Sequence, residues 1–85
     1  MTKIIFDDYL VKKLAKLPKD VFKIYKKQER IFTENWLDSR LHTKKLIGVN
    51  WYSFRVTRNY RVLFYFQDVD VVVFTDIGHR KDIYE

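Results

Sequence analysis

The chain contains no cysteine, only two glycines and a single proline among its 85 residues. The lack of cysteine excludes a disulfide framework and a thiolate zinc site, and it is consistent with the reducing cytoplasm. Two separated histidines cannot complete a zinc site without scattered carboxylates, so we expect neither a metal nor another cofactor. The scarcity of glycine and proline predicts regular elements joined by short connections.

A long apolar run is also missing. No stretch approaches the ~20 apolar residues that a membrane-spanning helix needs. The N-terminal residues, which lead directly into Asp7 and Asp8, are too short and too acidic for a signal peptide. We therefore expect one domain over residues 1–85, located in the cytoplasm.

Hydrophobic residues account for 47% of the chain and aromatic residues for 18%, enough for a modest core. The formal net charge of +6 favours an anionic partner such as nucleic acid. Charge alone would equally fit a membrane surface, an acidic protein, or a soluble domain that happens to be basic.

Hydrophobic periodicity predicts one strand and two helices in the first half. Residues 3–6 form a short apolar run typical of an edge strand. Leucines at helical spacing predict a helix from about Asp8 to Leu17, which Pro18 ends. A second helix should reach about Glu34, and helices joined so tightly form an antiparallel hairpin. Their lysine-rich faces are typical of solvated surface, with phosphate contact as the alternative.

The segment 36–50 has the least regular pattern. Lys44 and Lys45 are basic and loop-like, and a strand that begins at Leu46 is interrupted by Gly48. His42 is a single isolated imidazole, which we interpret as an exposed loop residue rather than a ligand or a base.

The pairing register of the hairpin in residues 51–67 determines which side chains share a face. A three-residue turn at 57–59 places Arg55 and Arg61 together on one face, because side chains alternate sides along a strand. A two-residue turn would bury each unpaired guanidinium group among aromatic rings, which is costly. We therefore predict the three-residue turn, with the two arginines as exposed cross-strand neighbours. Like charges placed directly opposite destabilise a sheet, which favours an anion as ligand, with Asp76 as the alternative partner.

The opposite face of this hairpin would then be apolar, with side chains from Phe54, Val56, Tyr60, Val62, Phe64 and Phe66. The run 71–77 is nearly all apolar, so we expect a central or doubly covered strand. The order of elements predicts an α+β two-layer sandwich. It comprises an N-terminal strand, a two-helix hairpin and a three-strand antiparallel meander, with both helices on one face of a four-stranded, mainly antiparallel sheet.

The tail continues with Gly78-His79-Arg80, read as a turn, and Tyr84 near the end. These residues can supply a proton donor, a cation for a developing phosphorane charge and a ring for base stacking.

With these residues the sequence resembles the RelE/ParE superfamily of type II toxins, along essentially the whole chain. The most specific pieces are Arg-Val-Thr-Arg-Asn-Tyr-Arg-Val at 55–62 and Gly-His-Arg-Lys-Asp-Ile-Tyr at 78–84. The resemblance implies a toxin bound by a cognate antitoxin in a hetero-oligomer, without a membrane partner. It further implies a ribosome-dependent endonuclease that cuts mRNA in the A site. The RNA 2′-hydroxyl attacks the adjacent phosphate and leaves a 2′,3′-cyclic phosphate, with no metal required.

The resemblance also implies site residues. The expected catalytic residues are Arg61, His79, Arg80 and Tyr84. The expected RNA-binding residues are Arg55, Arg58, Lys44 and Lys45.

Two departures from the family pattern leave the general base open. Ser53 stands where many relatives carry a basic residue, and there is no match for the catalytic Glu of the YoeB branch or the paired lysines of RelE. His79 is the first candidate for the base, because its ordinary pKa lies near working pH. The ParE branch shares the fold, binds DNA gyrase and does not cut RNA. A gyrase inhibitor and a non-catalytic nucleic-acid-binding module therefore stay as alternatives, although the His-Arg…Tyr tail favours a nuclease.

Overall fold

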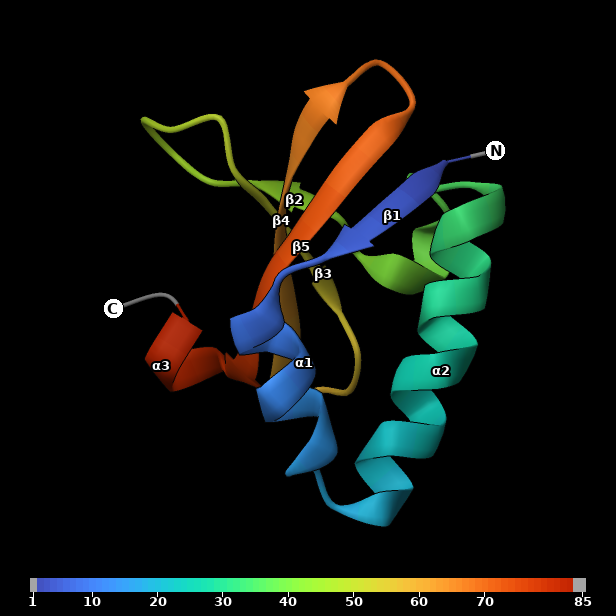
Figure 1. The fold of residues 1–85 in the computed structure, drawn as a ribbon, viewed down its shortest axis with the longest axis vertical. Helices are drawn as coiled ribbons and strands as arrows, with labels where there is room; N and C mark the ends of the chain where they lie inside the picture. The colour runs from blue at the N-terminus through green and yellow to red at the C-terminus, as the bar shows by residue number, and fades with distance from the viewer. Residues whose placement is uncertain (1, 84–85) are drawn as a thin grey trace.

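The computed structural model describes residues 2–83 as a mixed α+β fold (Figure 1). The elements in chain order are β1 (Lys3–Phe6), α1 (Asp8–Ala15), α2 (Lys19–Glu34), the 3-10 helix η1 (Ser39–Leu41), β2 (Lys44–Lys45), β3 (Tyr52–Arg55), β4 (Tyr60–Asp68), β5 (Val71–His79) and α3 (Arg80–Ile83). No helix in this range is both long and apolar enough to cross a membrane.

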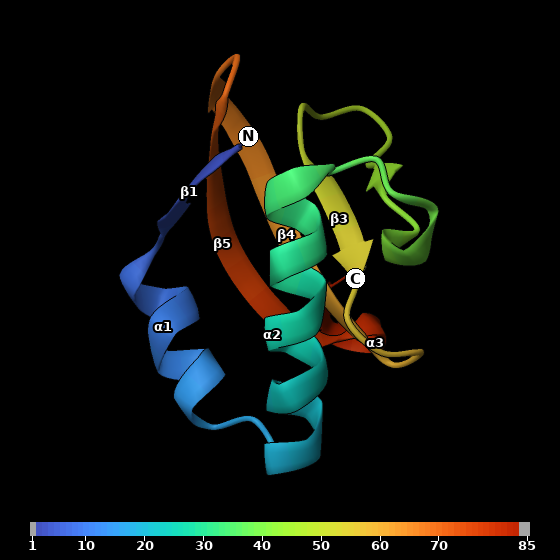
Figure 2. The ribbon, with the colours of Figure 1, turned by 90° about the vertical axis from the view of Figure 1, so that its right-hand side faces the viewer.

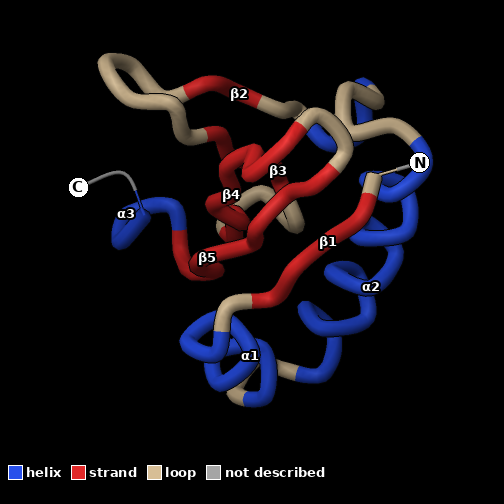
Figure 3. The backbone as a smooth tube through the Cα atoms, turned by 45° about the horizontal axis from the view of Figure 1, so that its top comes forward, coloured by secondary structure: helices blue, strands red, loops and turns tan. Residues whose placement is uncertain are grey.

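The sheet has five strands in the order β1-β5-β4-β3-β2, with β1 and β2 at its edges (Figure 3). β1 runs parallel to β5, and the other pairs are antiparallel, so the predicted mainly antiparallel sheet and the central position of β5 are confirmed. The predicted number of four strands is wrong by one. Lys44 and Lys45 form β2 against β3, and Leu46 N–H extends the pairing to the Trp51 carbonyl at 2.8 Å. This strand depends on backbone bonds to β3 and has no apolar alternation that would predict it.

Both helices lie where the sequence predicts them. The side chain of Asp7 caps α1 by accepting a hydrogen bond from Tyr9 N–H at 2.8 Å. α1 ends at Ala15 rather than Leu17. The N–H groups of Lys16 and Leu17 donate to carbonyls three residues earlier, which is the hydrogen-bond pattern of a 3-10 turn and not of an α-helix. Figure 2 shows α2 in front of the sheet and running in the opposite direction to α1.

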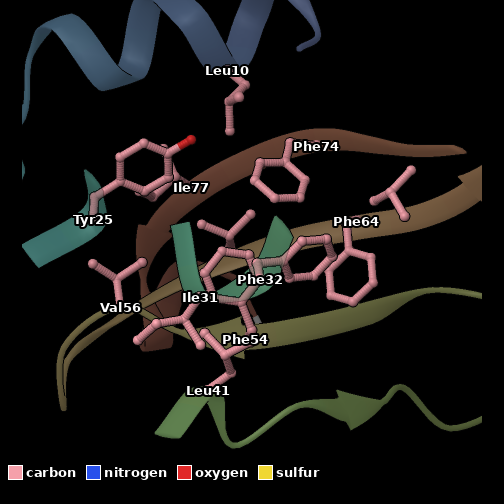
Figure 4. Close-up of a cluster of buried hydrophobic side chains, with 12 residues drawn as sticks. Leu10, Tyr25, Ile31, Phe32, Leu41, Phe54, Val56, Phe64, Phe74 and Ile77 are labelled. Atoms are coloured by element: carbon pink, nitrogen blue, oxygen red, sulfur yellow. The ribbon is translucent and has the colours of Figure 1, made fainter. Parts of the chain in front are cut away.

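One hydrophobic core joins both helices to the same face of the sheet (Figure 4). Phe32 of α2 lies at its centre, with ring centroids 5.2 Å from Phe54, 4.9 Å from Phe64 and 5.0 Å from Phe74. Leu10 of α1 belongs to the same cluster. Such edge-to-face and tilted contacts suit the ring quadrupoles. The helices therefore leave the other face, here called the outer face, to the remaining side chains of the strands.

The hairpin between β3 and β4 has the predicted register. Val56 N–H donates to the Tyr60 carbonyl at 2.9 Å, and Arg55 lies directly opposite Arg61. Phe54, on the opposite face from the arginines, is fully buried. The three-residue turn is thus confirmed, and it separates a core face from a cationic outer face.

The predicted tail turn is wrong. Gly78 and His79 continue β5 and pair with Arg61 and Tyr60 of β4. Arg80 then begins α3, and its N–H donates to the Asn59 carbonyl at 2.7 Å. Apolar residues end at Ile77, so the sequence pattern does not reveal that backbone pairing continues for two further residues. Tyr84 lies outside the described residues.

Candidate functional site

A cavity of about 520 Å³ opens at the end of β3 and the start of β4, beside the first residue of α3. Within residues 2–83, its lining consists of His42, Thr43, Lys44, Arg55, Arg61 and Arg80. Four of these six side chains are cationic, and they come from β2, β3, β4 and α3. The fold thus gathers most of the expected basic site residues, which are far apart in the sequence, around one hollow.

The guanidinium group of Arg61 is anchored from one side. Its Nη1 donates to the carbonyl oxygens of Thr57 at 2.8 Å, Arg58 at 3.1 Å and Tyr60 at 3.3 Å. These carbonyls belong to the β3–β4 turn and the start of β4, so the turn fixes the direction of the side chain. Carbonyl oxygens orient the guanidinium group but leave its full charge available to a ligand.

The charge of the cavity is not balanced by acids within residues 2–83. None of Arg55, Arg61 and Arg80 forms an ion pair with another described residue. Asp76, the alternative partner for the arginines, instead accepts a hydrogen bond from Lys13 Nζ of α1 at 2.6 Å. Arg55 also has a buried Nε without a hydrogen-bond partner in the described part of the chain. Mutually repelling cations with unused donors favour a bound anion.

Hydrogen bonds from the helix layer hold the backbone beside the cavity. Gln28 of α2 is buried, and its Nε2 donates to the carbonyls of Arg40 at 3.0 Å and Arg55 at 2.9 Å. Thr43 Oγ1 donates to the Trp36 carbonyl at 2.7 Å. Buried amide donors that are fully used hold a backbone strongly. The helix layer therefore positions both β3 and the segment that carries His42.

His42 is exposed, as predicted, yet it also lines the cavity. It ends η1 with a left-handed backbone, φ 48°. η1 is itself capped by Asp38, whose carboxylate accepts from Arg40 N–H at 2.9 Å and pairs with the Arg40 guanidinium group at 2.9 Å. That side-chain hydrogen bond from Arg40 lowers the pKa of Asp38 to about 2. No local pattern marks His42 as a site residue, because its place in the cavity depends on long-range contacts.

His79 does not line the cavity. It lies opposite Tyr60, with ring centroids 6.0 Å apart, and Tyr60 packs against the core. His79 therefore projects from the face opposite to Arg61, since neighbouring residues of a strand alternate sides. Its Nδ1 accepts a hydrogen bond from Lys81 N–H at 3.3 Å.

Two of the expected RNA-binding residues also lie outside the lining. Lys45 is opposite Tyr52, whereas Lys44 is opposite Ser53, so the two lysines project from different faces. Arg58 is exposed in the β3–β4 turn. No group of three or more histidine, aspartate and glutamate side chains in the described range is close enough to hold a metal ion.

Solved structures of known proteins share this fold. A chain of the RelB–RelE antitoxin–toxin complex from Methanococcus jannaschii is 32% identical, with a TM-score of 0.75, and the match covers 94% of each chain. The chain belongs to the RelE/ParE superfamily of type II toxins. The resemblance found in the sequence is thereby confirmed.

Solved structures of lower sequence identity share the same fold. The archaeal RelE–RelB complex from Pyrococcus horikoshii OT3 matches at 20% identity and a TM-score of 0.77, over 93% of this chain and 94% of that chain. YafQ from E. coli strain BL21(DE3) matches at 12% identity and a TM-score of 0.78, over 100% of both chains. No family model and no curated protein sequence matches the chain.

Proposed function

We propose that this RelE/ParE-type toxin is a ribosome-dependent, metal-independent mRNA endonuclease. The observation that carries the proposal is the cavity, where Arg55, Arg61 and Arg80 meet without an ion pair among residues 2–83. Three guanidinium groups can bind a phosphate with parallel N–H donors. Charge that develops on the phosphorus oxygens would be stabilised most by donors already fixed in place, as Arg61 is.

The reaction needs no nucleophile from the protein. The RNA 2′-oxygen forms a bond to the adjacent phosphorus while the bond from phosphorus to the 5′-oxygen breaks, which gives a 2′,3′-cyclic phosphate and a 5′-hydroxyl. The 2′-hydroxyl proton must pass to a base, and the departing 5′-oxygen must gain a proton.

His42 is the imidazole that lines the cavity, and we assign it the first proton transfer. Among residues 2–83, Lys44 is the other lining side chain that carries a transferable proton, and it is the candidate for the second transfer. The roles of His79 and Tyr84 stay predictions.

We also propose a cognate antitoxin as a protein partner, together with mRNA and the ribosomal A site. The solved relatives from Methanococcus jannaschii and Pyrococcus horikoshii are toxin–antitoxin complexes. A partner that covers the cationic cavity would carry acidic side chains, because like charges would repel it.

Cleavage of mRNA on programmed ribosomes tests the proposal with Arg61→Ala and, as a matched control, Arg30→Ala. Arg30 is an exposed arginine on α2, and it does not line the cavity. Arg61→Ala should reduce the cleavage rate by at least about 100-fold, the effect of removing one preorganised charge-stabilising donor. Arg30→Ala should cleave like the wild type, and both variants should keep the wild-type circular dichroism spectrum.

Three outcomes would contradict the proposal. Intact transcripts at stoichiometric wild-type toxin would exclude ribosome-dependent cleavage. Blocked supercoiling with intact mRNA would identify a gyrase inhibitor, the activity expected of the ParE branch. Salt-dependent nucleic-acid binding without cleavage or growth arrest would identify a non-catalytic binding module.

A further inference from the structure

The outer face of the sheet carries an aromatic pair beyond the cavity. The rings of Trp51 and Tyr65 lie 5.4 Å apart between centroids at an angle of 44°. Trp51 is 37% exposed, and within residues 2–83 its indole N–H has no hydrogen-bond partner. The pair therefore leaves aromatic ring area exposed on the outer face, and such rings contribute a large apolar contact area when a ligand covers them.

Register places this pair in line with the two arginines of the cavity. Ser53 lies opposite Leu63, and Arg55 lies opposite Arg61. Trp51 is four residues before Arg55, and Tyr65 is four residues after Arg61, so all four side chains project from the outer face. Four residues of a strand span about 13 Å.

Lys44 lies between the cationic cavity and the aromatic pair. It lies opposite Ser53, between the level of the arginines and the level of the aromatic rings. It lines the cationic cavity and also a second hollow of about 420 Å³, whose lining is Lys44, Lys45, Leu46, Ile47 and Val49. Leu46 N–H donates to the Trp51 carbonyl at 2.8 Å, so the backbone of one lining residue pairs with that of Trp51. The outer face thus presents arginines, then a lysine, then two rings.

We propose that Trp51 and Tyr65 form a base-stacking subsite for single-stranded RNA whose backbone is held in the cationic cavity. The proposal rests on the proposed function and adds a second contact with the same strand. Proteins that bind single strands combine a cationic groove for the phosphates with aromatic rings for the bases. Continuity with four cations favours a polyanion that carries flat rings over an apolar protein segment.

The test separates stacking from charge by using RNA that cannot be cut. Single-stranded 2′-O-methyl RNA lacks the nucleophile, and a second oligonucleotide of equal length with abasic sites keeps the phosphates without the bases. Each is titrated against the wild type, Trp51→Ala, Trp51→Phe and Tyr9→Ala. Tyr9 is a matched control, since it is a 58% exposed aromatic residue on α1.

Trp51→Ala should weaken binding of the base-containing RNA about tenfold or more, the typical effect of losing one stacked base. Its affinity for the abasic oligonucleotide should equal that of the wild type. Trp51→Phe should recover part of the affinity because it keeps a ring, and Tyr9→Ala should bind both as the wild type does. Tryptophan fluorescence should be quenched by the base-containing RNA in the wild type and not in Trp51→Phe.

Equal losses for the two oligonucleotides, or no loss, would overturn the subsite, as would the absence of measurable binding by the folded wild type. A loss of antitoxin affinity with unchanged RNA affinity would assign the rings to a protein partner and would also overturn it. Cleavage by Arg61→Ala is measured separately on ribosomes. The two measurements therefore distinguish a protein that binds RNA bases without cleaving mRNA from one that cleaves mRNA without the stacking subsite.

Discussion

At the scale of single residues, two histidines in different surroundings offer different chemistry. His42 lines the cationic cavity, whereas His79 is opposite Tyr60 and has its Nδ1 engaged by Lys81 N–H. A general base must lie within hydrogen-bond reach of the proton that it removes. That requirement favours His42, because the scissile phosphate would be held by the arginines beside it.

His42→Gln and His79→Gln should therefore have unequal effects on cleavage. We expect His42→Gln to reduce the single-turnover rate about 10²- to 10⁴-fold, the usual range for loss of a general base. His79→Gln should change it by much less. The reverse order of effects would assign the base to His79.

At the scale of elements, the short helix η1 determines where His42 lies. Asp38 caps η1 through Arg40 N–H and also holds the Arg40 guanidinium group. Because Arg40 lowers the pKa of Asp38 from 3.8 to about 2, the charged carboxylate is favoured in the folded state. The resulting stabilisation is fully present above about pH 4 and is lost as pH falls through about 2.

Two substitutions at Asp38 separate the cap from the charge. Asp38→Asn keeps an oxygen that can accept from Arg40 N–H, whereas Asp38→Ala removes both contacts. At pH 7 the melting temperature should fall in the order wild type, Asp38→Asn, Asp38→Ala. The difference between the wild type and Asp38→Asn should shrink as pH approaches 2. A carboxyl resonance of Asp38 that titrates near its ordinary pKa would contradict the assigned contact with Arg40.

The secondary-structure elements also differ in how well the sequence predicts them. The β3–β4 hairpin alternates strongly, and burial of an unpaired Arg55 or Arg61 would be so costly that only one register is acceptable. β2 has two lysines and no alternation, so it forms only because β3 offers a free edge. His42 lines the cavity because the capped helix η1 places it there. Neither the cap nor the cavity is visible as a local sequence pattern around His42.

At the scale of the whole molecule, the two faces of the sheet have different roles. One face packs against the helices and stabilises the fold, and the outer face concentrates positive charge. Phe32 and its neighbours fill the helix side, so the outer face contributes less to the core. Arg55 illustrates the cost of this arrangement. It lies opposite Arg61, and its buried Nε has no hydrogen-bond partner among residues 2–83; both features are unfavourable to folding. Natural proteins accept such local conflicts where a ligand needs the groups.

Arg55→Gln should consequently preserve or raise the melting temperature while it weakens RNA binding. The affinity for single-stranded 2′-O-methyl RNA should fall with salt, since each neutralised phosphate adds about 0.7 to the slope of log affinity against log salt concentration. Arg55→Gln should lower that slope by about 0.7, because it removes one phosphate contact. Trp51→Ala should weaken binding at every salt concentration with little change in slope, because stacking releases no counterions. An Arg55→Gln protein with an unchanged slope would show that Arg55 does not contact phosphate, and the charge of the cavity would then have to act through Arg61, Arg80 and Lys44 alone.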